Sequence, residues 1–260
     1  MGEATKSPLR VHFDCRLKLE FRGTTITSDA GLLAFRELDD ALGLTGMAAS
    51  RLTECRKGKN TQQALVALLR QSIFGRLAGY EDVNDAERLR LDPAMRSLVG
   101  HGDAPRYAAS TSEMARFETE QLATEENLEA LPDLSGHWID RVYERTALKD
   151  LVLDMDSSDS PTFGQQEGST FNGHFGFTCY HPLFVFNQFG DLERAMLRPG
   201  NVHSSKGWRE ALEPVVARYR SRKLTRSLRA DAAFARPEIY EFLEAEGFQY
   251  VIRLPANERL

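Results

Sequence analysis

The sequence predicts an α/β protein in which helices flank a mixed β-sheet and a mostly helical region precedes that sheet. Before residue 148 the apolar positions repeat mainly at helical spacing, whereas after it short apolar runs of strand length alternate with helical segments. The chain has 260 residues and is 42% hydrophobic, which is enough to bury a substantial core. We therefore predict two domains, residues 1–147 and residues 148–260.

The N-terminal region is predicted to contain one strand and four helices. Residues 11–21 alternate apolar and polar side chains, which is typical of a strand. Ser28 and Asp29 offer a cap for a helix that ends at Gly43. The apolar side of this helix is predicted to comprise Leu32, Leu33, Phe35, Leu38 and Leu42. The other helices are predicted at residues 61–79, 111–127 and 137–148.

The C-terminal region is predicted to begin with three strands and then to alternate helices with strands. The strands are placed at residues 148–158, 181–188, 192–200, 225–234 and 248–255. Helices at residues 207–223 and 236–247 connect the last three strands, and the second helix has proline near its start and glycine just past its end. This order favours a mixed sheet with helices on its faces. It matches the early part of an RNase H-like fold.

Acidic residues stand near the ends of two predicted strands. Asp154 and Asp156 end the first strand, Asp159 follows them, and Asp231 lies at or near the end of the fourth. Neighbouring strand ends can bring Asp156 close to Asp231, and two close carboxylates repel unless a cation neutralises them. Carboxylate oxygens suit Mg²⁺, although a two-metal centre usually needs a third acid. Asp154 and Asp156 share a strand face, so we expect one to bind metal and the other to support it.

A second chemistry also fits this segment. Asp154 and Asp156 resemble the nucleophile strand of haloacid dehalogenase-type phosphatases, in which they would act as nucleophile and general acid. That class also needs a downstream lysine and a paired acidic motif. After residue 160, Asp191 and Asp231 each stand alone, which disfavours the phosphatase alternative.

The net charge of −5 gives no general indication of nucleic-acid binding, so the distribution of charge matters more than its sum. One basic cluster stands out, formed by Arg218, Arg220, Arg222, Lys223, Arg226 and Arg229. DNA contact and a solvated helix face are both open interpretations of this cluster.

The three cysteines, Cys15, Cys55 and Cys179, form no CxxC pair, which suits a reducing compartment. The sequence has no apolar run of membrane-spanning length and no signal peptide. From these observations we expect a cytoplasmic protein that does not enter a membrane.

Several long and irregular stretches carry a family resemblance. They are GYEDVNDAERLRLDP (residues 79–93), DSSDSPTFGQQEGSTFNGH (156–174), LRPGNVHSS (197–205) and LRADAAFARPEIYEFLEAEGFQYVIRL (228–254). In these stretches the chain resembles insertion-sequence DDE transposases of the thirteen-eighty group. The resemblance implies an RNase H-like catalytic domain behind a mostly helical region that helps to bind the ends of the element.

The resemblance also assigns residues. Asp156 matches the first catalytic aspartate of the family and Asp231 the second, with Asp154 and Asp159 as supporting residues. Mg²⁺ is the implied cofactor and Mn²⁺ the alternative. The family's third acid is a glutamate on a later helix, and we expect the chain to stop before it. Four further residues match the sequence pattern of the family without an assigned role: Gln165, Gln166, Asn172 and His174.

The implied function is transposition of an insertion sequence. The expected partners are double-stranded DNA with terminal inverted repeats, target DNA, and a second copy of the chain on paired ends. The alternative is a truncated derivative or remnant that binds DNA without cutting it. The two hypotheses differ in whether metal-dependent nicking occurs.

Overall fold

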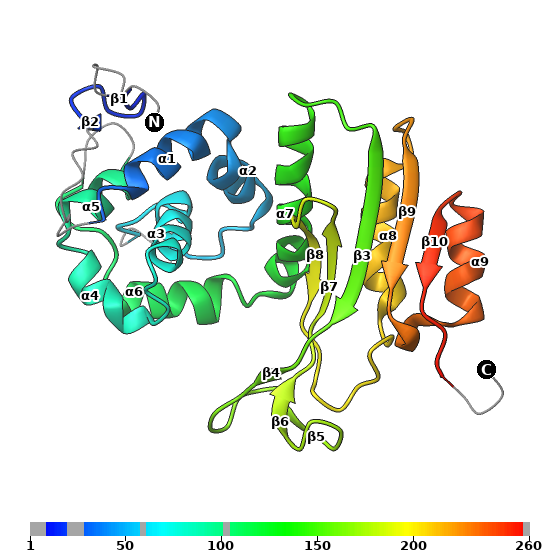
Figure 1. Cartoon of the computed structure of the whole chain (residues 1–260). Helices are drawn as coiled ribbons and strands as arrows, with labels where there is room; N and C mark the ends of the chain where they lie inside the picture. The colour runs from blue at the N-terminus through cyan, green and yellow to red at the C-terminus, as the bar shows by residue number, and fades with distance from the viewer. Residues whose placement is uncertain (1–8, 20–28, 58–60, 101–104, 257–260) are drawn as a thin grey trace, which may run out of the picture. The chain divides into compact units, whose positions relative to one another are not determined.

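The structure is a computed structural model that describes residues 9–19, 29–57, 61–100 and 105–256 (Figure 1). The chain forms two compact units, residues 1–131 and 132–260. The division falls inside helix α7 (Glu125–Tyr143). The predicted domain boundary at residue 148 lies just before strand β3 (Asp150–Ser157).

The first unit is mostly helical, as predicted. Its helices are α1 (Leu32–Leu42), α2 (Leu44–Arg51), α3 (Leu65–Leu77), α4 (Ala86–Leu89), α5 (Pro93–Val99) and α6 (Thr111–Arg116), with short 3₁₀ and π turns at Val83–Asp85 and Phe117–Gln121. The prediction of a single strand over residues 11–21 is wrong. Two-residue strands β1 (Leu9–Arg10) and β2 (Lys18–Leu19) pair instead. Ser28, the expected cap, lies outside the described residues.

Short local signals set several helix ends in this unit. Gly43 ends α1 in the left-handed conformation, with φ of 76°, which glycine adopts without a Cβ clash. Asp92 caps α5 through the Met95 N–H, and proline follows at the first helical position. Ser110 and Glu113 form a reciprocal capping box at α6. The predicted helix over 111–127 is interrupted, because α6 continues into the π turn, which ends at Gln121, and α7 begins only at Glu125.

The second unit contains the predicted mixed sheet. Its strand order is β10-β9-β3-β7-β8, formed by β3, β7 (Leu183–Asn187), β8 (Leu192–Met196), β9 (Thr225–Ala230) and β10 (Gln249–Ile252). The pairs β3–β7 and β7–β8 are antiparallel, whereas β3–β9 and β9–β10 are parallel. With three antiparallel strands followed by two parallel ones, this is the RNase H-like order expected from the sequence (Figure 1).

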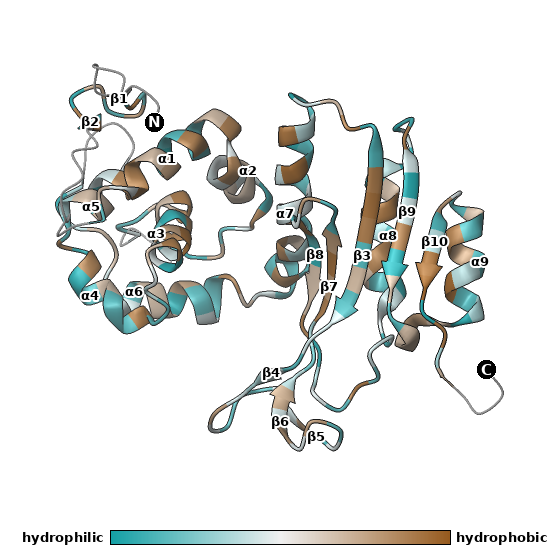
Figure 2. Ribbon diagram, viewed as in Figure 1, coloured by the Kyte–Doolittle hydropathy of each residue, from teal (hydrophilic) through white to brown (hydrophobic). Residues whose placement is uncertain are grey.

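Helices α8 (Trp208–Tyr219) and α9 (Pro237–Ala245) make the two connections to the parallel strands. The core of the unit lies between these helices and one face of the sheet, where Leu151, Leu153 and Met155 of β3 are at most 1% exposed. Figure 2 shows the hydrophobic character of the β3 ribbon at this position. The intervening residues of β3 lie on the opposite face, so Asp154 and Asp156 share a face as predicted. Among the described residues, no helix is both long and apolar enough to span a bilayer.

A small three-stranded sheet is inserted between β3 and β7, and sequence analysis did not predict it. Its strands are β4 (Ser160–Pro161), β5 (Thr170–Asn172) and β6 (Phe177–Tyr180), in the order β4-β6-β5. Figure 1 shows it extending from the carboxyl end of β3. The insertion therefore begins at the edge of the main sheet where the acidic residues lie.

Gly200 packs against this small sheet, and we expect Gly200→Ala to lower the free energy of unfolding by about 1–3 kcal/mol. A Cβ at this position would lie 2.3 Å from the Thr170 carbonyl oxygen and 2.5 Å from that of Cys179. Both are backbone atoms of paired strands, so neither can move away at low cost. Urea denaturation of the full chain measures the loss. Gly173→Ala is the matched control, because a Cβ there meets no atom within 4 Å; equal losses in the two variants would contradict the prediction.

Candidate active site

Asp156 and Asp231 lie at the carboxyl ends of two neighbouring parallel strands. Strands β3 and β9 pair with Asp154 opposite Arg229 and Met155 opposite Ala230. Continuing this register by one residue places Asp156 opposite Asp231, and neighbouring strands lie about 4.8 Å apart. Both residues are exposed. The strand register therefore places the backbones of the two predicted catalytic residues side by side at the carboxyl ends of β3 and β9.

Each of these carboxylates is oriented by a nearby backbone N–H. Asp156 Oδ1 accepts from Ser157 N at 2.8 Å, and Asp231 Oδ1 accepts from Ala233 N at 3.0 Å as the cap of a short 3₁₀ turn. Within the described ranges no three His, Cys, Asp or Glu residues are grouped to hold a metal ion. Two exposed carboxylates nevertheless fit Mg²⁺, which proteins typically hold with one or two carboxylates plus water and substrate phosphate.

Asp154 differs from Asp156 in its partner. The Arg229 guanidinium donates two hydrogen bonds to the Asp154 carboxylate, at 2.7 and 2.6 Å. This bidentate contact raises the pKa of Arg229 above its ordinary value. In the described part of the chain, Arg229 engages both Asp154 oxygens, whereas Asp156 accepts from the adjacent backbone N–H, so Asp156 has the carboxylate more open to a metal ion.

Asp159, the other predicted supporting residue, follows β3 at an exposed position. Its charge acts on the buried thiol of Cys179 in the small sheet, whose pKa is raised mainly by burial and further by Asp159. Asp159 therefore lies at the junction of the main sheet and the insertion.

The structure places the six residues of the predicted basic cluster in different surroundings. Arg218 and Arg222 pair with Asp140, Arg220 with Glu246, and Arg229 with Asp154, while Arg226 lies over the Phe248 ring and Lys223 is exposed. Lys223 precedes β9 and Asp231 follows it. The six residues of that strand span about 20 Å, so Lys223 lies at the opposite edge of the sheet from the carboxylates. Arg229 is the member of the cluster beside the candidate site.

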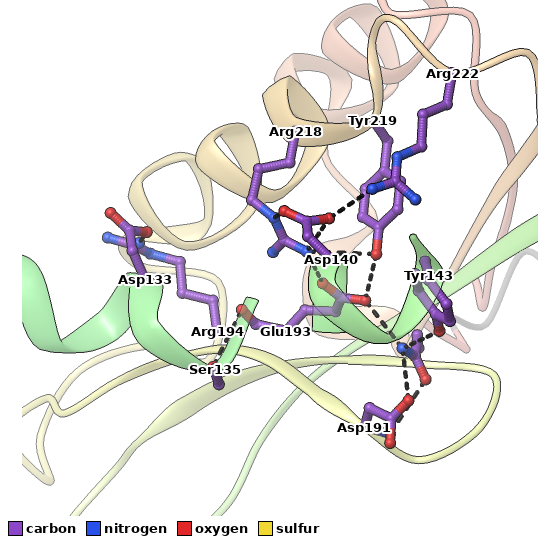
Figure 3. Close-up of polar contacts among 11 residues, drawn as sticks. Asp133, Ser135, Asp140, Tyr143, Asp191, Glu193, Arg194, Arg218, Tyr219 and Arg222 are labelled. Carbon is purple, nitrogen blue, oxygen red and sulfur yellow. Dashed lines mark hydrogen bonds and ion pairs between the residues drawn. The ribbon is translucent and has the colours of Figure 1, made fainter. Parts of the chain in front are cut away.

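Arg218 belongs to a buried polar network centred on Glu193 of β8 (Figure 3). The Glu193 side chain is fully buried and accepts from Arg218 Nη2 and from the Tyr219 hydroxyl, both at 2.8 Å. Asn187 Nδ2 donates to Glu193 at 3.0 Å and to the Tyr143 hydroxyl at 2.9 Å. Burial, with Glu193 and Asp191 nearby, raises the pKa of Tyr143 to about 12, so the phenol stays protonated.

The same network attaches the second half of α7 to the sheet. Asp140 of α7 accepts from Arg218 at 3.1 Å and from Arg222 at 2.9 Å, and Asp133 pairs with Arg194 of β8. These contacts hold α7 and α8 on β8. Sequence analysis assigned Arg218 and Arg222 to a surface cluster and did not single out Glu193; an acid within a strand of the predicted sheet is the signal that could have identified it.

Of the residues whose roles were open, Asn172 ends β5 and His174 lies in the turn between β5 and β6. Asn172 is buried, donates to the Gly200 carbonyl oxygen at 2.6 Å, and accepts from His174 N at 2.8 Å and Phe175 N at 3.1 Å. It therefore orders this turn. His174 is exposed, as are Gln165 and Gln166 in the preceding loop.

The sheet order and its paired strand-end carboxylates place the chain in the RNase H-like class. Residues 9–260 match the family described as transposase DDE domain, group 1, and the chain belongs to that family. This membership favours the transposase hypothesis over the phosphatase alternative. No curated protein sequence is significantly similar to the chain.

A similar solved structure is the cryo-EM structure of a piggyBac transposase synaptic complex with hairpin DNA. The sequence identity is 13% and the TM-score 0.36, and the alignment covers 92% of this chain and 46% of that one. The chain thus spans about half the length of that protein.

Proposed function

We propose that the chain is a DNA transposase of an insertion sequence, in which Asp156 and Asp231 hold a divalent metal ion for phosphoryl transfer. The observation that carries this proposal is the parallel register of β3 and β9, which sets the two carboxylates side by side. Family membership supports DNA as the substrate class. Mg²⁺ is the proposed ion, with Mn²⁺ as the alternative, because both take oxygen ligands.

At this edge of the sheet, we propose that some groups hold the metal ion and others orient the groups that hold it. A bound divalent ion would activate a water or a 3′-hydroxyl and stabilise the leaving oxygen of an in-line displacement. Asp156 and Asp231 would hold that ion, with the N–H groups of Ser157 and Ala233 fixing their orientation. Arg229 holds the Asp154 carboxylate in an ion pair, so that Asp154 does not compete with Asp156 for the metal ion.

We propose double-stranded DNA with terminal inverted repeats and target DNA as partners, with residues 1–147 binding the element ends in a homodimer on paired ends. The exposed Lys223 is proposed to contact DNA away from the cut, since it precedes β9 and Asp231 follows that strand. The proposed compartment is the cytoplasm. Phosphate contacts of this kind make binding fall steeply as salt rises.

The test uses the full chain and a labelled duplex that carries the inverted repeat bordering its gene. We expect a mobility shift with or without metal, and strand nicking only with Mg²⁺ or Mn²⁺. A shift without nicking would support the alternative, a derivative that binds DNA and does not cut it. A binding constant that stays unchanged between 50 and about 200 mM salt would count against DNA as the partner.

A further inference from the structure

A hollow lies between the small sheet and the loop that follows β8. It has a volume of about 550 Å³ and is lined by Asn172 at the end of β5, by residues 173–175 of the β5–β6 turn, by His181 and by residues 201–204. Three of the lining side chains are imidazoles, those of His174, His181 and His203, and the lining residues include no aspartate or glutamate. The hollow therefore offers hydrogen-bond donors and no competing negative charge.

A buried cation lies directly behind the wall of this hollow. Arg198 is 5% exposed and pairs with no acidic residue in the described part of the chain. Its Nε donates to the His181 carbonyl oxygen at 2.7 Å and its Nη1 to that of Ser204 at 2.8 Å. Its Nη2 atom is buried and has no partner there. Arginine stays protonated in proteins, so Arg198 carries a positive charge. Among the described residues, only backbone carbonyl groups offset this charge. An anion bound in the hollow would stabilise the buried guanidinium.

The hollow lies at the same edge of the main sheet as the candidate active site. In the sheet, Leu183 of β7 pairs with Ser157 of β3 on one side and with Met196 of β8 on the other. His181 lies just before β7 and Arg198 just after β8, so both extend beyond the edge that carries Asp156. Strands β3 and β8 are two positions apart, about 10 Å. This spacing exceeds one nucleotide step of DNA, which is about 3.4 Å per strand.

We propose that this hollow binds a backbone phosphodiester of the DNA, a few nucleotides from the phosphate that is cut. The proposal rests on the proposed function for the identity of the anion. His203 Nδ1 accepts from Ser205 N at 3.2 Å, so the neutral ring carries its proton on Nε2 and can donate to a phosphate oxygen. Asn201, Ser204 and His174 supply further donors of the kind that position phosphates. Arg198 supplies the long-range attraction from behind the wall.

The experiment compares the wild type with a His174→Ala, His203→Ala double variant on labelled end duplexes. Each duplex carries one uncharged methylphosphonate at a different position near the cut. We expect one such position to weaken wild-type binding about tenfold, and to have no further effect in the double variant. Identical methylphosphonate profiles in the two proteins would overturn the proposal.

A second arm separates this inference from the proposed function. If the wild type binds no duplex, the proposed function fails, and thermal unfolding with and without inorganic phosphate tests the hollow alone. Stabilisation of the wild type only would make this a site for free phosphate and overturn its assignment to DNA; stabilisation of neither protein would overturn the anion site itself. Asn201→Ala with Ser204→Ala replaces the double variant if that variant does not fold.

Discussion

Replacing Asp231 with asparagine is expected to slow metal-dependent DNA cleavage by at least about a thousandfold while duplex binding persists. The substitution removes one charged metal ligand, and metal stabilisation of the transition state is worth several kcal/mol. Asparagine caps a helical turn as well as aspartate does, so the hydrogen bond from Ala233 N and the local fold should remain. Asp156→Asn should show the same loss. Single-turnover nicking of an end-labelled duplex measures both.

Asp154→Asn is the matched control, because it changes an aspartate on the same strand face two residues away. It removes the ion pair with Arg229 but leaves Asp156 and Asp231 in place. We expect this variant to retain most of the cleavage rate. If Asp154→Asn abolished cleavage while Asp156→Asn preserved it, the assignments of these two residues would be reversed. Normal cleavage by both Asp156→Asn and Asp231→Asn would rule out the proposed metal site.

Glu193→Ala is expected to destabilise the second unit by about 3–5 kcal/mol. The Arg218 side chain is 14% exposed and loses one of its two acidic partners among the described residues, so that Asp140 alone remains. The Tyr219 hydroxyl and Asn187 lose an acceptor in the same step. Burying such groups without partners costs more than the original pair contributes. Urea denaturation, followed by tryptophan fluorescence and far-UV circular dichroism, measures the change.

An exposed ion pair in helix α8 provides the comparison for this variant. Arg209 and Glu213 are 52% and 46% exposed, so solvent screens their attraction, and Glu213→Ala should cost at most about 1 kcal/mol. The loss of unfolding free energy in Glu193→Gln should lie between those of Glu193→Ala and Glu213→Ala, because the amide keeps the shape of the side chain and one acceptor oxygen. Equal losses from Glu193→Ala and Glu213→Ala would show that the buried network does not stabilise the fold as we describe.

The main sheet could be predicted from the sequence because its central strands are short apolar runs, and in β3 the alternate residues Leu151, Leu153 and Met155 are buried. The inserted small sheet could not. Its strand β4 consists of Ser160 and Pro161, both exposed, and strands this short carry no periodicity that a pattern can register. Backbone pairing with Cys179 and Tyr180 forms them instead.

Buried polar groups account for other failures of prediction. In α1, Phe35 and Leu38 were assigned to the apolar side, yet they are 50% and 46% exposed, and Arg36 is buried instead. Its Nε donates to the Leu98 carbonyl oxygen, 62 residues away. A hydrophobicity pattern cannot register a polar side chain that becomes acceptable only through a partner distant in sequence.

In the candidate site, too, some features follow from local sequence and others depend on residues distant in sequence. Strand-end position made Asp156 and Asp231 candidates, and the family resemblance assigned them as the catalytic pair, which stays a prediction. The pairing of Asp154 with Arg229 joins residues 75 apart and depends on the parallel register, which no local pattern contains. The edge on which Lys223 lies also follows from strand direction, and the sequence alone left that direction open.

The pairing of β3 with β9 also bears on the order in which the second unit folds. Strands β7 and β8 are joined by a tight turn at Gly190 and can form a hairpin within microseconds. Joining β3 to β9 closes a much longer loop, and contacts of such high contact order form slowly. Because Asp156 and Asp231 meet only through this pairing, a partly folded chain would hold the hairpin but not the adjacent carboxylates. Affinity for a divalent ion would then arise with the last strands to assemble.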